Sequence, residues 1–213
     1  MNSIKVRILY GLISVLTVFC LALSGQVGGQ VSSGSGGGGA GCDTALWDNS
    51  SGSPVGDLDI TDSIGTVYVG QEFEDTSAHT ICKVTVYVTY RGGDISGKTF
   101  SAYLVPTASN GYINTANLVE ADSTVTGSND WNETAISFTW STGYVVAANT
   151  STAFVVTMNG GVDTVNYAEL EYYNDGVIPG SGEGTAGADT WSAAGAIQGA
   201  GGTYDIKAIF YTK

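Results

Sequence analysis

The stretch ICKVTVYVTY, residues 81–90, has the clearest structural pattern in the chain. Its alternate positions form an apolar or aromatic set and a polar set: Cys82, Val84, Val86, Val88 and Tyr90 against Lys83, Thr85, Tyr87 and Thr89. Successive side chains of a β-strand point to opposite faces of its sheet. The alternation therefore predicts a strand with one buried face and one polar face.

The same alternation recurs along the chain in short segments separated by Gly, Asn, Asp and Ser. We predict strands over Thr66–Phe73, Lys98–Pro106, Glu133–Trp140, Gly143–Ala148, Ser151–Asn159, Asn166–Tyr173 and Thr203–Thr212, with a weaker strand or pair over Asn117–Thr126. A Gly-rich loop is expected from Asn174 to Ala188. Many short strands with regular turn signals predict an all-β fold, an antiparallel β-sandwich of jelly-roll type.

The N-terminal segment has the features of a secretory signal peptide. Lys5 and Arg7 precede an apolar run over residues 8–23, which ends in the small residues of Ala22-Leu23-Ser24. A basic start, an apolar core and a small-residue cleavage site are typical of such signals, so we expect residues 1–24 to be removed on export. The alternative is an uncleaved anchor, although a membrane span needs about 20 apolar residues.

Residues 25–41 are rich in Gly and Ser and show no apolar periodicity, which predicts a flexible linker. The folded domain is then expected over residues 42–213. Cys42 and Cys82 are the only cysteines left once the signal is removed. An even pair of cysteines in an exported chain predicts a disulfide, and the alternative is two buried free thiols.

The chain is strongly acidic, with a net charge of −13 at pH 7. Loss of the signal removes two basic residues and leaves five basic and 20 acidic residues, a net charge of −15. Such a surface repels nucleic acid and anionic membranes, so we expect neither as a partner of the mature protein. The same charge is compatible with a secreted or cell-surface domain.

Several segments together resemble known secreted modules. They are Gly70-Gln71 with Phe73, the strand Val84–Val88, Gly93 with Gly97-Lys98, the stretch Ser137–Met158 and the closing Tyr204–Tyr211. This order is similar to that of secreted β-sandwich modules of the choice-of-anchor and carbohydrate-binding-like kind, over roughly residues 65–213. The resemblance implies a jelly-roll-like fold and an extracellular adhesive or glycan-binding role. It supplies no functional residues.

Aromatic residues are the best candidates for binding a polysaccharide or a cell-surface glycan, because sugar rings stack on exposed aromatic faces. Trp131 follows a polar turn, and Trp191 follows the Gly-rich loop. Tyr167 and Tyr173 share one face of a predicted strand. We therefore predict a carbohydrate site from these four residues, whereas Trp140 is expected in the core.

Acidic residues suggest a structural calcium ion as a cofactor. Asp57, Asp59 and Asp62 lie at short spacing, and calcium prefers oxygen ligands. The segment lacks the glycine and the terminal glutamate of an EF-hand loop. A solvated acidic loop without metal is the alternative.

Catalysis has weak support. The single histidine, His79, is expected in a solvated turn and belongs to no triad motif. Glu169 and Glu171 share a strand face, and retaining glycosidases use two carboxyl groups about 5–5.5 Å apart. Neighbouring acids are also ordinary on a solvent-facing strand, so we expect no enzyme, with a glycoside hydrolase as the remaining alternative.

Asn49, Asn132 and Asn149 begin N-x-S/T triplets. Such triplets arise by chance in a chain rich in Asn and Thr, and glycosylation depends on the host.

Taken together, these features predict a secreted, non-catalytic module for carbohydrate binding or surface adhesion. The main alternative is a self-associating structural subunit of a filament or virion surface.

Overall fold

The computed structural model describes residues 41–51, 56–62, 67–107, 113–159, 163–174, 178, 187–192, 195–197 and 204–213. The predicted signal peptide (1–24) and nearly all of the predicted linker (25–41) lie outside these residues. In the part of the chain that is described, no helix is long and apolar enough to cross a membrane.

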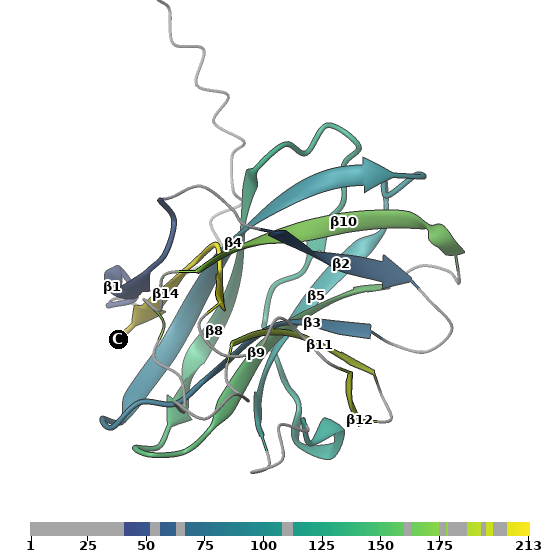
Figure 1. The fold of residues 1–213 in the computed structure, drawn as a ribbon. Coiled ribbons are helices and arrows are strands. Elements are labelled where there is room, and N and C mark those ends of the chain that lie inside the picture. The colour runs from purple at the N-terminus through teal and green to yellow at the C-terminus, as the bar shows by residue number, and fades with distance from the viewer. Residues whose placement is uncertain are drawn as a thin grey trace, which may run out of the picture. The chain divides into compact units, whose positions relative to one another are not determined.

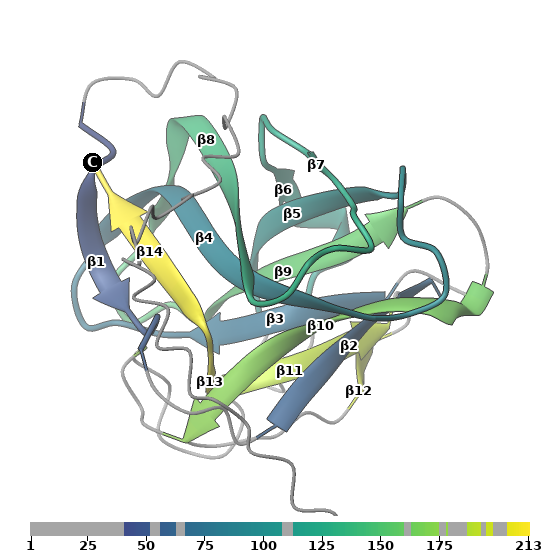
Figure 2. The ribbon, with the colours of Figure 1, turned by 90° about the horizontal axis from the view of Figure 1, so that it is seen from above.

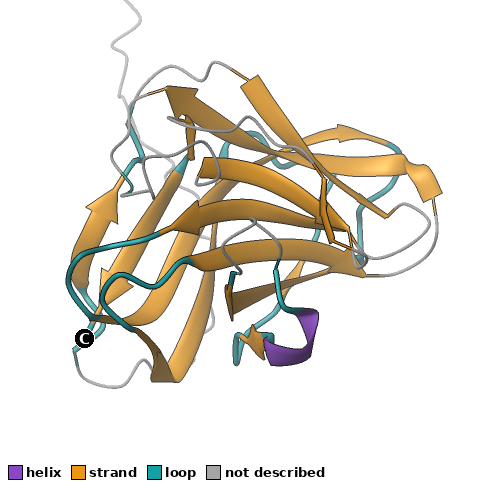
Figure 3. Cartoon of the chain, turned by 60° about the horizontal axis from the view of Figure 1, so that its bottom comes forward, coloured by secondary structure: helices purple, strands orange, loops and turns teal. Residues whose placement is uncertain are grey.

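Two antiparallel sheets form the domain, and the described residues add one short 3-10 helix, η1 (Thr115–Asn117) (Figures 1 and 3). Sheet A contains β1 (Thr44–Asp48), β2 (Gly56–Asp62), β4 (His79–Gly92), β8 (Thr134–Val146), β10 (Asp163–Asn174), β13 (Tyr204–Ile206) and β14 (Ala208–Thr212). Sheet B contains β3 (Val67–Phe73), β5 (Thr99–Pro106), β6 (Val119–Glu120), β7 (Val125–Thr126), β9 (Thr152–Asn159), β11 (Gly187–Ser192) and β12 (Gly195–Ile197). The predicted antiparallel β-sandwich is confirmed.

Strand β4 contains the ICKVTVYVTY stretch and organises sheet A. Strand β8 pairs with one edge of β4, and β14 followed by β10 pairs with the other. Along β4, the pairing with β14 extends as far as Val86, and the pairing with β10 starts at Val88. Strands β4 and β10 therefore form a fork, which the consecutive strands β13 and β14 enter, with β14 lying between β1 and β4 (Figure 2).

The core lies between the sheets and contains the predicted apolar face of β4. Cys82, Val84, Val86 and Val88 are buried. Aromatic rings from both sheets meet edge to face, with centroids 5.1 Å apart for Trp47 and Phe73 and 5.3 Å for Phe73 and Phe210. Burying one large apolar side chain contributes roughly 1.5–3 kcal/mol, so these rings are a main source of stability. Trp140 is buried, as predicted.

The predicted disulfide is present. Cys42 and Cys82 are bonded, with their Cα atoms 5.9 Å apart. The bond joins Cys42, two residues before β1, to the central strand β4.

Strand β8 differs from the prediction, because the segments expected over Glu133–Trp140 and Gly143–Ala148 form one strand. Ile81 pairs with Tyr144 and Lys83 pairs with Thr139, so two steps along β4 match five steps along β8. The extra residues form a bulge, and Gly143 adopts the left-handed region there with φ 76°. The glycine therefore allows a bend rather than ending the strand.

Other differences occur at both ends of the domain. Strands β1 and β2 precede the first predicted strand, and β2 replaces the expected acidic loop. Strand β11 begins within the predicted Gly-rich loop, and β12 follows it. The last predicted strand breaks at Lys207 into β13 and β14. Ile206, Ala208 and Phe210 nevertheless lie at alternate positions and are fully buried.

Candidate functional site

The outward side of sheet A carries the polar residues of ICKVTVYVTY and their neighbours. We call this surface the polar face and define it by residues of five segments. They are Lys83, Thr85, Tyr87, Thr89 and Arg91 of β4; Glu133 just before β8 and Ser137 in it; Asp59 of β2; Tyr167, Glu169 and Glu171 of β10; and Lys207 just before β14 with Tyr211 in it. It follows from strand alternation, because the opposite set of β4 residues faces the core.

One end of the polar face holds an ion pair between Arg91 Nε and Glu169 Oε2. The Arg91 side chain is 43 % exposed and that of Glu169 is 13 % exposed, so Arg91 is the more exposed partner of the pair. Glu169 of β10 lies opposite exposed Asp59 of β2 in the register of the two strands. Half-buried Tyr167 lies two residues earlier on β10. Donors, carboxylates and a phenol ring therefore lie on neighbouring strands.

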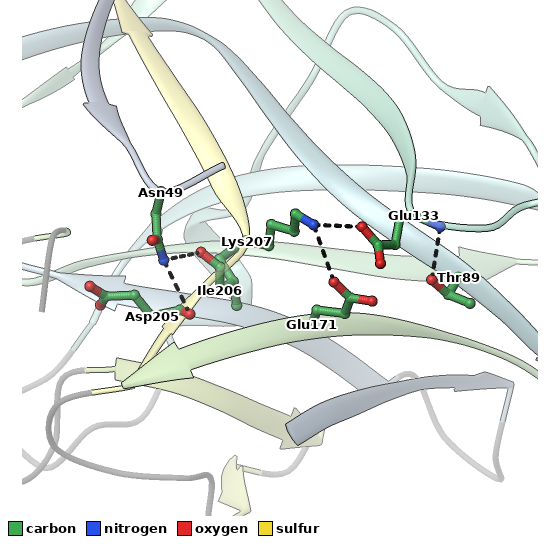
Figure 4. Close-up of polar contacts among 7 residues, drawn as sticks. All are labelled: Asn49, Thr89, Glu133, Glu171, Asp205, Ile206 and Lys207. Carbon is green, nitrogen blue, oxygen red and sulfur yellow. Dashed lines mark hydrogen bonds and ion pairs between the residues drawn. The ribbon is translucent and has the colours of Figure 1, made fainter. Parts of the chain in front are cut away.

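An ion-pair cluster of buried Lys207 and Glu171 with exposed Glu133 occupies the fork between β4 and β10 (Figure 4). Lys207 Nζ lies 2.8 Å from Glu133 Oε2 and 3.5 Å from Glu171 Oε2. The Lys207 N–H donates to the Glu171 carbonyl at 2.8 Å, and the Tyr87 N–H donates to the Lys207 carbonyl at 3.2 Å. Lys207 thus connects both prongs of the fork through its backbone and its side chain.

Glu133 is held in an unusual backbone conformation, with φ 47°. Its N–H donates to Thr89 Oγ1 at 3.0 Å, while its carboxylate contacts Lys207 (Figure 4). A residue other than glycine adopts this left-handed region at a cost of order 1–3 kcal/mol unless surrounding contacts hold it. These two contacts fix the position of the carboxylate at the rim of the polar face.

Cations and tyrosines continue along the rest of the polar face. Lys83 Nζ lies 3.7 Å from the centre of the Tyr211 ring, and Lys207 Nζ lies 5.1 Å from that of Tyr87. The hydroxyl groups of Thr85 and Ser137 are hydrogen-bonded at 2.8 Å. Three of the five basic residues within 42–213 are Lys83, Arg91 and Lys207. The scarce positive charge of this acidic domain is therefore concentrated on the polar face.

The predicted carbohydrate-binding residues are divided between different parts of the domain. Tyr167 lies on the polar face. The half-buried Trp131 ring packs against Phe100, with centroids 5.0 Å apart. Trp191 is in β11, where its backbone pairs opposite Tyr68, and Tyr173 is in β10. The side chains of Trp191 and Tyr173 lie outside the described part of the structure.

The predicted calcium ligands Asp57, Asp59 and Asp62 all belong to β2. Asp59 is exposed, and the side chains of Asp57 and Asp62 lie outside the described part. Among the described residues, no group of three or more His, Cys, Asp or Glu side chains could hold a metal ion. The calcium site stays a prediction.

His79 is packed rather than free in a solvated turn. It begins β4, and its ring centroid lies 5.7 Å from that of Trp47. Its Nε2 lies 3.2 Å from Asp75 Oδ2. The pKa of Asp75 is lowered from its usual value, first by the hydrogen bond from the Ser77 N–H and then by His79.

Glu72 is a buried acid with two hydroxyl partners. It lies in β3 and accepts hydrogen bonds from Ser151 Oγ and, at 2.6 Å, from Thr107 Oγ1. Its Oε2 has no hydrogen-bond partner within the described residues. Burial raises the pKa of Glu72 above its usual 4.5, and nearby Glu74 adds to the rise, whereas the two hydroxyl groups oppose it.

No known protein family matches the sequence, and no curated protein is significantly similar to it. The resemblance to secreted carbohydrate-binding-like modules therefore stays a prediction.

Proposed function

We propose that this protein is a secreted, non-catalytic β-sandwich module that binds a neutral polysaccharide or cell-surface glycan on the polar face. The observation that carries the proposal is the Arg91–Glu169 ion pair with its partly exposed arginine, which lies beside Tyr167 and Asp59 on adjacent strands. Export is supported by the disulfide, which persists in oxidising compartments.

The mixture of charges favours a neutral ligand. Each sugar hydroxyl both donates and accepts hydrogen bonds, so it is matched by donors and acceptors that alternate at fixed positions. Arg91 supplies donors, while Glu169 and Asp59 supply acceptors. The cations of this face have carboxylate or aromatic partners, which leaves no excess of positive charge to select an acidic glycan.

The same contacts favour binding over catalysis. A glycosidase of the usual kind needs one carboxylic acid that protonates the leaving group. Glu169 contacts Arg91 and Glu171 contacts Lys207, so each carboxyl group is already engaged by a basic side chain. We therefore infer that this pair positions the face rather than cleaving glycosidic bonds.

The test is retention of domain 42–213 on a panel of insoluble neutral and acidic polysaccharides, in calcium and again in chelator. Retention on a neutral polysaccharide without release of reducing sugar supports the proposal. Retention that requires calcium would assign the ion to the site or its support. Failure to bind any polysaccharide, with assembly seen by light scattering, would favour a self-associating subunit instead.

A further inference from the structure

The three N-x-S/T triplets have different surroundings in the folded domain. None of them has proline at the middle position, so all three fit the acceptor motif for N-linked glycosylation. An attached glycan is bulky and hydrophilic and needs a surface position. The structure therefore separates the triplets according to whether the asparagine amide is free to carry such a group.

Asn49 is a structural asparagine. The residue is only 2 % exposed. Its Nδ2 donates to the Ile206 carbonyl at 3.0 Å and to the Asp205 carbonyl at 3.4 Å (Figure 4). Its N–H also donates to the Ala208 carbonyl at 2.8 Å. A glycan on Nδ2 would occupy the space of the β13–β14 connection, so a chain modified there could not form this part of sheet A.

Asn132 and Asn149 lie in exposed turns at opposite ends of β8. Asn132 is exposed, and its backbone N–H donates to Thr134 Oγ1 at 3.2 Å. Asn149 lies in an exposed turn, residues 147–150, with φ 54°. Its backbone N–H donates to the Asp75 carbonyl at 2.7 Å. In both cases the backbone holds the turn, and the exposed side chain is available for modification.

We propose that Asn132 and Asn149 are sites of N-linked glycosylation on the exported protein and that Asn49 is not. The donor would be a lipid-linked oligosaccharide. The amide nitrogen forms a bond to the first carbon of the sugar, the bond from that carbon to the lipid pyrophosphate breaks, and the amide loses one proton. The inference rests on the proposed export but not on the proposed glycan binding.

The experiment uses the full chain, expressed with its own N-terminal segment in cells that perform N-glycosylation. Secreted protein is treated with a peptide-N-glycosidase in heavy-oxygen water. The enzyme converts each glycosylated Asn into an Asp that carries heavy oxygen, and peptide mass spectrometry locates the labelled residue. We expect label at positions 132 and 149 and none at 49. Asn132→Asp and Asn149→Asp should each remove one glycan, and the double variant should carry none.

A glycan on Asn49 of folded, secreted protein would overturn the inference, as would an unmodified Asn132 or Asn149. A chain that never reaches the medium would overturn the shared premise of export. Polysaccharide retention by the separately produced domain tests the proposed binding without depending on either result.

Discussion

Cys42 and Cys82 are joined across the terminal strand of the domain. Cys42 precedes β1, Cys82 lies in β4, and β14 is hydrogen-bonded between these two strands. Cys82 Sγ lies 3.5 Å from the Tyr211 carbonyl oxygen. The end of the chain is therefore enclosed by a covalent link between its two neighbouring strands, at the point where the predicted linker enters the domain.

Removal of this disulfide should loosen one side of sheet A first. The bond closes a loop with a sequence separation of 40 residues, and chain entropy gives a stabilisation of about 4 kcal/mol for a loop of this size. The double variant Cys42→Ser/Cys82→Ser should lose a similar free energy of unfolding. Hydrogen exchange should increase more in β1 and β14 than in β9, and equal increases in all three strands would contradict the account.

The contribution of Lys207 to the free energy of unfolding should depend on the presence of Glu171. Lys207→Met removes the cation beside a buried carboxylate, which typically costs about 3–5 kcal/mol. Lys207→Met/Glu171→Leu removes both charges and should recover much of that loss. Denaturant unfolding of the two single variants and the double variant measures the coupling, and additive losses would argue against a coupled pair.

Glu72 should make the domain less stable as pH rises. Its folded pKa lies above the usual 4.5, so the protonated form is favoured by folding. The stability that this group contributes is present below pH 4.5 and is lost as the pH rises through the folded value. Glu72→Gln keeps an oxygen that can accept from Ser151 and Thr107 but does not ionise.

Unfolding of wild type and Glu72→Gln across the range from acidic to neutral pH tests this directly. The free energy of unfolding of the variant should rise relative to that of wild type as pH rises. The difference between the two free energies should become small below pH 4.5. Other acids, such as Asp75, titrate in both proteins and cancel in the difference. A gap that does not change with pH would contradict the assignment to Glu72.

Local alternation predicted the sheets but not how strands bend or break. The β4 face was predicted residue by residue, because four apolar positions repeat with period two. The bulge in β8 depends on its register with β4, which a single segment does not encode. Strand β2 was missed because only Leu58 and Ile60 mark its buried side between acids.

The candidate site was predicted in part, for a similar reason. Strand alternation placed Glu169 and Glu171 on one face. Their partners Arg91 and Lys207 are distant in sequence and come together only through the pairing of β4, β10 and β14. Trp131 follows a polar turn in the sequence, but its ring packs against buried Phe100 of β5, a contact between distant residues that the local pattern does not encode.

The most direct measurement is the affinity of domain 42–213 for the retained polysaccharide, compared among Glu169→Gln, Arg91→Gln and Glu120→Gln. Glu120 is an exposed acid on β6 of sheet B and serves as the matched control. Hydrogen bonds to charged groups contribute about 1.5–3 kcal/mol, so the two polar-face variants should bind about ten- to a hundredfold more weakly. Glu120→Gln should bind as wild type does. Unchanged affinity in both polar-face variants would contradict binding at this face.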